Sequence, residues 1–139
     1  ELRLIHAPGH TKDSVMVYVE DDEVLFASDT MMPVPSIVDG DINSLRRSLQ
    51  KILEWQINRI VQGHGEVILV GEVERMVQTR LDYLDAIEQV VAETIEHGQE
   101  KDVLQENNIE SCGLSRLPLN GQVQQIHVAN LLSLYDQMA

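Results

Sequence analysis

The first third of the chain consists of short apolar runs separated by polar turns, a pattern typical of β-strands. We expect strands at residues 2–5, 15–19 and 24–27, with the last two forming an antiparallel hairpin around the acidic tip Glu20–Glu23. The hairpin arms are almost continuously apolar, which is typical of a sheet covered on both faces. Two closely spaced prolines after the hairpin predict an irregular loop.

From Asp41 onward the apolar positions recur every three or four residues, which is the period of amphipathic helices. Asp41 is a suitable N-cap for the first helix, and Gly98 is a suitable stop for the longest one. The further elements are expected at residues 42–53 (helix), 59–62 (strand), 73 to the stop at Gly98 (helix), 101–107 (short helix) and 122–137 (helix). This order predicts an α/β fold in which helices are layered on a mixed sheet.

The length and composition fit one globular domain. We expect a sheet-and-helix part at residues 1–70 and a helical extension at 71–139 that packs on it. The net charge of −13 disfavours binding to nucleic acid or to an anionic membrane surface. A single cysteine, Cys112, excludes an intramolecular disulfide and fits a reducing, cytoplasmic location. The chain begins without Met inside a predicted strand, so a truncated or processed chain is expected.

Three predicted strands are each followed by a potential metal ligand. His6 and His10 follow the first strand, Asp29 follows the third, and His64 follows the strand at 59–62. Loops at strand ends commonly form ligand sites, and imidazole and carboxylate groups suit zinc, iron or manganese. However, a histidine in a glycine-rich turn commonly caps a carbonyl, and an aspartate after a strand commonly forms a turn. The pattern alone therefore leaves both interpretations open.

Three short motifs contain these residues, in chain order: PGHT at 8–11, LFASDT at 25–30 and QGHG at 62–65. Together they resemble motifs of the metallo-β-lactamase-fold hydrolases, a superfamily that includes glyoxalase II-like thioesterases and lactonases. The resemblance covers roughly residues 2–66, and the following helix resembles the helical extensions of some members. His6 matches no ligand position of the family and is expected to serve the turn or support the site.

Carried onto this sequence, the resemblance implies that His10 binds a first metal, His64 binds a second, and Asp29 bridges the two. Such a centre would hold a hydroxide between two zinc ions, with iron or manganese as alternatives, and would polarise the bond to be hydrolysed. Asp29 is therefore also the catalytic candidate. Met31 and Met32 directly follow Asp29, and they are candidates for lining an apolar substrate groove at the mouth of the site.

The family's H-x-H-x-D-H motif, which lies in the N-terminal half of its fold, does not occur in this sequence. The resemblance therefore implies half of an αββα sandwich, a mixed sheet with flanking helices, followed by a C-terminal helical extension. The missing motif would supply two further ligands to each metal. Because a catalytic zinc usually has three protein ligands, we expect this chain alone to bind metal poorly or not at all and to be inactive.

The implied function is the C-terminal portion of a metal-dependent hydrolase for esters, thioesters, lactones or phosphoesters. The alternative is a non-catalytic, self-associating domain derived from that fold, so whether this chain is an enzyme stays open. A half-sandwich would leave its apolar inner sheet face bare. We expect that face to be covered by the missing N-terminal half, by a second copy in a homodimer, or by the chain's own C-terminal helices. A small-molecule substrate is expected for the reconstituted site.

Overall fold

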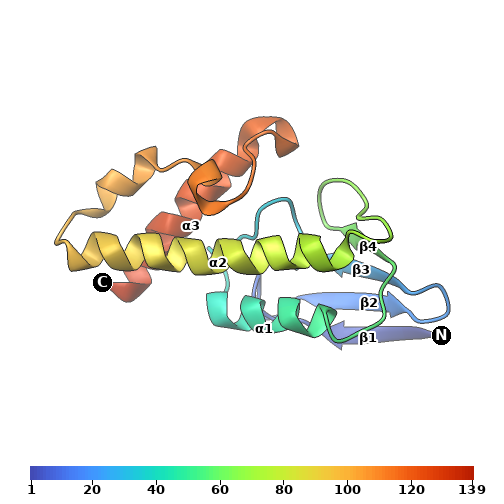
Figure 1. The fold of residues 1–139 in the computed structure, drawn as a ribbon. Helices are drawn as coiled ribbons and strands as arrows, with labels where there is room; N and C mark the ends of the chain where they lie inside the picture. Colours follow the sequence, from blue (N-terminus) through green and yellow to red (C-terminus); the bar gives the residue numbers. More distant parts are fainter.

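The computed structural model describes residues 1–139 and contains one four-stranded mixed sheet with helices (Figure 1). The elements are β1 (Leu2–His6), β2 (Val15–Val19), β3 (Val24–Ser28), α1 (Ile42–Ile52), β4 (Arg59–Gln62), α2 (Val73–Glu96), three short 3₁₀ helices η1 (Lys101–Glu106), η2 (Ile109–Cys112) and η3 (Pro118–Gly121), and α3 (Gln122–Met138). The strand order is β1-β2-β3-β4, with the first two pairings antiparallel and β3–β4 parallel. The predicted α/β class and the hairpin are confirmed.

The helices begin and end where their boundary residues predict. Asp41 caps α1, because its Oδ2 atom accepts a hydrogen bond of 2.7 Å from the backbone N–H of Ser44. Gly98 follows α2 with a φ of 67°, a conformation that glycine adopts without the strain of a Cβ atom. The short helix expected at 101–107 is the 3₁₀ helix η1, consistent with the preference of this tighter helix for short segments.

One hydrophobic core joins the sheet to the helices. On the sheet it takes up alternate positions, including the fully buried Met16, Leu25 and Ile60, which lie on the face covered by α1 and α2. The long helix α2 spans the molecule, so its first half packs near the sheet and its second half packs with α3 (Figure 1). Residues from both the sheet part and the helical extension contribute to this core.

The opposite face of the sheet is apolar and uncovered. The register aligns Leu4, Val17, Phe26 and Val61 across all four strands, and Leu4 and Phe26 are 78% and 45% exposed. The expectation of a sheet covered on both faces is therefore wrong for this chain. The C-terminal helices do not cover this face either, because α3 packs on α2 and the 3₁₀ helices.

The helices are unsuited to crossing a membrane. No helix combines the length and the hydropathy that a bilayer span requires.

Candidate metal centre

His10, Asp29 and His64 converge at one edge of the sheet. The His10 Nε2 atom lies 3.5 Å from Asp29 Oδ2, and the His64 Nε2 atom lies 3.6 Å from Asp29 Oδ1. Each carboxylate oxygen thus faces a different imidazole. The side chains are 23%, 40% and 60% exposed in chain order, so the group is open to solvent on the His64 side. The three predicted ligands, far apart in sequence, are brought together.

An irregularity in β3 presents Asp29 toward the histidines. The pairing of β3 with β4 shifts register between Phe26 and Ser28, and Ser28 has a φ of 49°, which is unusual for a residue with a side chain. The Ser28 hydroxyl holds this conformation by donating a 2.8 Å hydrogen bond to the Val15 carbonyl. Strain of this kind concentrates at functional sites, and here it lies directly before the carboxylate.

Gly63 supports Asp29 by leaving room for it. Its N–H lies 2.8 Å from the Ser28 carbonyl and 3.1 Å from the Met31 carbonyl, which ties the end of β4 to the Asp29 turn. A Cβ atom at position 63 would collide with Asp29 Oδ1 and with the Ser28 backbone. Position 63, directly before His64, therefore requires glycine because the Asp29 side chain and the Ser28 backbone lie too close for a Cβ atom.

This packing predicts that Gly63→Ala displaces the Asp29 carboxylate. We expect destabilisation of roughly 1–3 kcal/mol from overpacking, and loss of any metal affinity that depends on Asp29. Urea unfolding of the chain would measure the first effect, and zinc titration of the chain joined to an N-terminal half that completes the site would measure the second. The matched control is Gly71→Ala: a Cβ atom added at Gly71 would meet no other atom within 4 Å, so only the positive φ of 87° contributes strain. Wild-type zinc affinity in a folded Gly63→Ala variant would contradict the packing argument.

The hydrogen bonds of His10 leave one ring nitrogen for a cation. Its Nδ1 atom lies 3.1 Å from the Ser36 carbonyl, which can only accept, so a neutral His10 carries its proton on Nδ1. Nε2 and Asp29 Oδ2 are then two acceptors facing each other at 3.5 Å. A proton or a metal ion between them would relieve this repulsion, and a backbone carbonyl behind a metal-binding histidine is a common supporting contact.

The donor set fits a divalent metal but does not complete its coordination. No group of three or more His, Cys, Asp and Glu side chains is arranged to hold a metal ion by itself. Each Asp29 oxygen with its facing imidazole offers two donors to one position. A catalytic zinc usually has three protein ligands, so each position requires further donors.

The loop behind His10 is anchored by α3. Asn130, which is fully buried, accepts a 3.0 Å hydrogen bond from the Ile37 N–H and donates a 2.7 Å hydrogen bond to the Pro35 carbonyl. It therefore fixes both sides of Ser36, whose carbonyl orients His10. The helix expected at 122–137 thus has a structural link to the His10 loop that was not apparent from the sequence.

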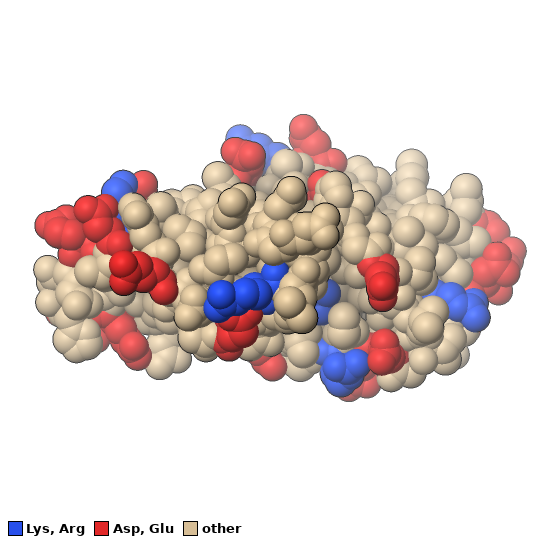
Figure 2. Space-filling model, turned by 90° about the horizontal axis from the view of Figure 1, so that it is seen from above, with Lys and Arg blue, Asp and Glu red and all other residues tan.

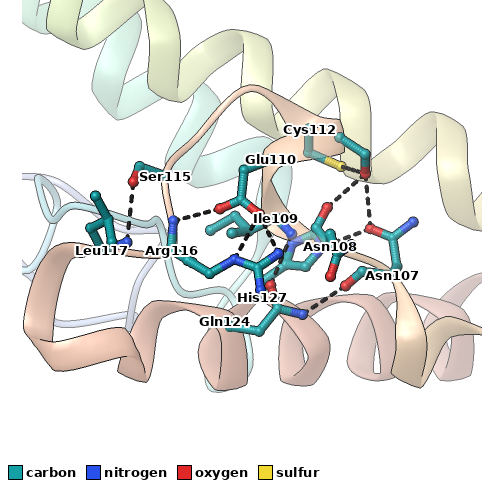
Figure 3. Close-up of polar contacts among 11 residues, drawn as sticks. Asn107, Asn108, Ile109, Glu110, Cys112, Ser115, Arg116, Leu117, Gln124 and His127 are labelled. Carbon is teal, nitrogen blue, oxygen red and sulfur yellow. Dashed lines mark hydrogen bonds and ion pairs between the residues drawn. The ribbon is translucent and has the colours of Figure 1, made fainter.

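The same network contains a buried neutral histidine. The Nε2 atom of His127 lies 2.8 Å from Asn107 Oδ1 (Figure 3), and its Nδ1 atom lies 2.8 Å from the Tyr83 hydroxyl oxygen. Tyr83 in turn accepts a 3.1 Å hydrogen bond from Asn130. The arrangement suits an imidazole that donates from Nε2 and accepts at Nδ1. Burial lowers the pKa of His127 from its ordinary value of 6.5 to about 4.

This shift predicts a loss of stability in mild acid. The unfolded chain takes up a proton on His127 as the pH falls below 6.5, whereas the folded chain resists until about pH 4. The stability is therefore complete above pH 6.5 and falls between these values, by roughly 2 kcal/mol at pH 5. Urea unfolding at pH 7.5 and pH 5 would measure the loss. His127→Gln, which has no proton to gain, should show a smaller loss, and equal losses would contradict this assignment.

The other predicted site residues lie in different surroundings. Met31 is fully buried and Met32 nearly so, and the Met32 carbonyl accepts a hydrogen bond from Arg80. Neither methionine side chain lines an open groove in this chain, because the turn after Asp29 directs both into the interior. His6 makes no hydrogen bond to a site residue; its Nε2 atom bonds the Lys12 carbonyl at 2.8 Å and holds the turn.

The comparisons with curated proteins find relatives for part of the chain. The beta-lactamase-like protein 2 homolog of Caenorhabditis elegans is 34% identical over 82 residues, which are 58% of this chain and 28% of that protein. The homolog of the same name from Drosophila melanogaster is 35% identical over 81 residues, or 57% of this chain and 27% of that protein. The matched segment thus spans little more than a quarter of each relative. No protein-family model matches the chain.

Solved structures match nearly the whole chain in fold. A metallo-beta-lactamase family protein from Thermus thermophilus superimposes with a TM-score of 0.69 at 16% identity, covering 99% of this chain and 43% of that one. A stereoselective inverting sec-alkylsulfatase from Pseudomonas sp. gives a TM-score of 0.69 at 13% identity, covering 99% of this chain and 24% of that one. At these identities the likeness concerns the fold alone.

Proposed function

Because this chain has part of the metallo-β-lactamase fold, as its motifs predicted, we propose that it is the C-terminal portion of a metal-dependent hydrolase. The bonds hydrolysed would be those of esters, thioesters, lactones or phosphoesters. His10, Asp29 and His64 would be its contribution to a two-metal site, with zinc as the first candidate and iron or manganese as alternatives.

The observation that carries this proposal is the arrangement of three metal-binding side chains around one carboxylate. Asp29 directs one oxygen to His10 and the other to His64, at 3.5 and 3.6 Å. This division suits a carboxylate shared between two neighbouring cations. A structural carboxylate commonly accepts hydrogen bonds from backbone N–H groups, as Asp41 does from Ser44 and Glu110 does from Arg116, whereas the Asp29 carboxylate accepts none.

Each residue would have a separate role. Divalent metal at this site would supply Lewis-acid activation of water and of the scissile carbonyl or phosphoryl group. Asp29 would offset the repulsion between two cations, and the Ser36 carbonyl would keep the His10 Nε2 lone pair directed at the site. The solvent-exposed side of His64 leaves an approach for substrate and for ligands from outside this chain.

We further propose that a second protein segment covers the apolar sheet face. Leu4 and Phe26 are exposed apolar side chains on this face, which is typical of a surface that another protein segment covers. The chain also matches only part of each relative. The cover would be an N-terminal half of the same fold, which would also bring the remaining metal ligands, or a second copy of this chain.

The second candidate function is a non-catalytic, self-associating domain, and the same uncovered face favours it. The two functions predict different zinc affinities once the sheet face is covered. An N-terminal half would complete the coordination of both metal positions, whereas self-association without catalysis would leave zinc affinity low in the assembled state.

A chimera would test the proposed hydrolase. In it, this chain replaces the segment that it matches in the Caenorhabditis elegans relative. Zinc content after dialysis and hydrolysis of nitrophenyl acetate, a thioester, a lactone and bis-nitrophenyl phosphate would be compared with those of the chain alone. We expect bound zinc and hydrolysis of at least one substrate only in the chimera. A folded chimera that binds no metal would overturn the proposal.

A further inference from the structure

At the end of β4 lies a pocket of about 530 Å³, within the usual range for small-molecule sites. Its walls come from four places in the chain: the loop after β3, the end of β4 with the loop that follows it, the first half of α2, and the segment 115–119 at the start of η3. Its lining includes Gln62 and Gly65, which flank the His64 position on either side. The pocket therefore adjoins the loop that carries His64, although His64 itself does not line it.

Arg80 lines this pocket and is only 4% exposed, yet no carboxylate neutralises it. Its Nε–H donates to the Met32 carbonyl at 3.1 Å, and Nη1 donates to the Met76 carbonyl and the Thr79 hydroxyl at 3.2 Å each. All of these acceptors are neutral. None of the ion pairs in the structure includes Arg80.

The guanidinium also has hydrogen-bonding capacity left on the pocket side. Nη2 has one long hydrogen bond, 3.4 Å to Gln62 Oε1, and its second N–H has no protein acceptor. Gln62 is itself held by a 2.6 Å hydrogen bond from its Nε2 to the Glu66 carbonyl. A buried guanidinium without a counter-charge is costly, and an anion that enters the pocket would offset that cost. Desolvation lowers the pKa of Arg80 to about 10, which leaves it charged at neutral pH.

The remaining pocket walls are largely apolar. Met76, Leu117 and Leu119 supply the aliphatic surface. The loop that carries the two leucines is braced by Arg116, which pairs with Glu110 at 2.6 Å (Figure 3) and so is not directed to the pocket. Glu66 is the one acidic residue in the lining, and it lies on the exposed rim.

We propose that this pocket binds a small anionic group, a carboxylate or phosphate, attached to an apolar substituent, with Arg80 as its charge partner. The inference rests on the proposed function for its biological sense, because it would place the anionic end of a hydrolase substrate beside His64. The surface seen in Figure 2 is mostly uncharged, with acidic groups spread along its whole length and fewer basic groups among them, and the chain's net charge is −13. Anion binding by this protein thus requires a specific site.

The test uses three related probes on the chain in the presence of a chelator: 3-phenylpropionate, phenethyl phosphate and the neutral 3-phenylpropionamide. Binding is followed through amide NMR shifts. We expect saturable shifts at Gln62 and Leu117 with at least one anion, and binding of the amide weaker by about tenfold or more. The tighter of the two anions identifies the physiological chemistry. Equal binding of all three probes, or no binding, would overturn the proposal.

Two substitutions sharpen this experiment. Arg80→Met should weaken anion binding by about tenfold or more while leaving the amide unaffected. Glu66→Gln removes a carboxylate at the pocket rim without altering the core, and it should strengthen anion binding. This variant keeps the test valid if Arg80→Met fails to fold. Unchanged anion binding in a folded Arg80→Met protein would overturn the assignment. Because metal is absent throughout, failure here is separate from failure of the hydrolase proposal.

Discussion

Replacing Asp29 with alanine is expected to abolish both metal positions together, lowering zinc affinity by more than about 100-fold in the chimera that binds zinc. Loss of an outer-shell partner alone costs roughly 10–100-fold, and Asp29 faces both histidines directly. His64→Ala should instead remove one position and leave His10 with Asp29. Competition against a chromophoric zinc chelator would measure the affinities.

Asp13→Ala is the matched control for this substitution. Asp13 is an exposed carboxylate in the loop of His10, and its removal changes the net charge of −13 by the same amount. We expect wild-type zinc affinity in this variant. If Asp29→Ala and Asp13→Ala bind zinc equally, the carboxylate between the histidines is not a ligand.

The second large effect concerns the uncovered sheet face. We expect the isolated chain to self-associate through this face, and the double variant Leu4→Lys/Phe26→Lys to be monomeric, with association weakened by about tenfold or more. Leu4 and Phe26 are 78% and 45% exposed within one chain, so charges there should cost little folding stability. Light scattering over a concentration series would measure the association, and urea unfolding would check the fold.

Val103→Lys provides a comparison on another surface. Val103 is an exposed apolar residue on η1, away from the sheet, and its substitution adds a charge without touching the open face. This variant should associate as the wild type does. A wild-type chain that is monomeric at every concentration would contradict the assignment of the face as an interface.

The local elements were predictable because each depends on neighbouring residues. Alternating apolar runs and the acidic tip indicate the hairpin, and Asp41 and Gly98 mark helix ends through their own backbone preferences. The strand-end pattern marked His6, His10, Asp29 and His64 as possible ligands, and the resemblance of three motifs to a known family selected His10, Asp29 and His64 among them. The approach of His64 to Asp29 within 3.6 Å follows from the sheet, which places the ends of β3 and β4 side by side.

The support of the site could not be predicted, since it depends on contacts between distant segments. Asn130 lies far along the chain from the Ser36 loop that it holds, and nothing in the spacing indicates that pairing. Arg80 falls on the buried side of α2, at the spacing of core residues, so the sequence does not indicate that it lines a pocket. Met31 and Met32 illustrate the converse error: proximity in sequence to Asp29 did not place them in the site.

The most direct test of the shared centre is a zinc titration of the chimera, followed by the NMR signals of the imidazole nitrogens that this chain contributes to it. The chain has five histidines, so the response can be assigned individually. We expect Nε2 of His10 and Nε2 of His64 to shift together, and neither to shift in the Asp29→Ala form of the chimera. Shifts shared equally by His6 and His97, or none at the two site histidines, would contradict this expectation.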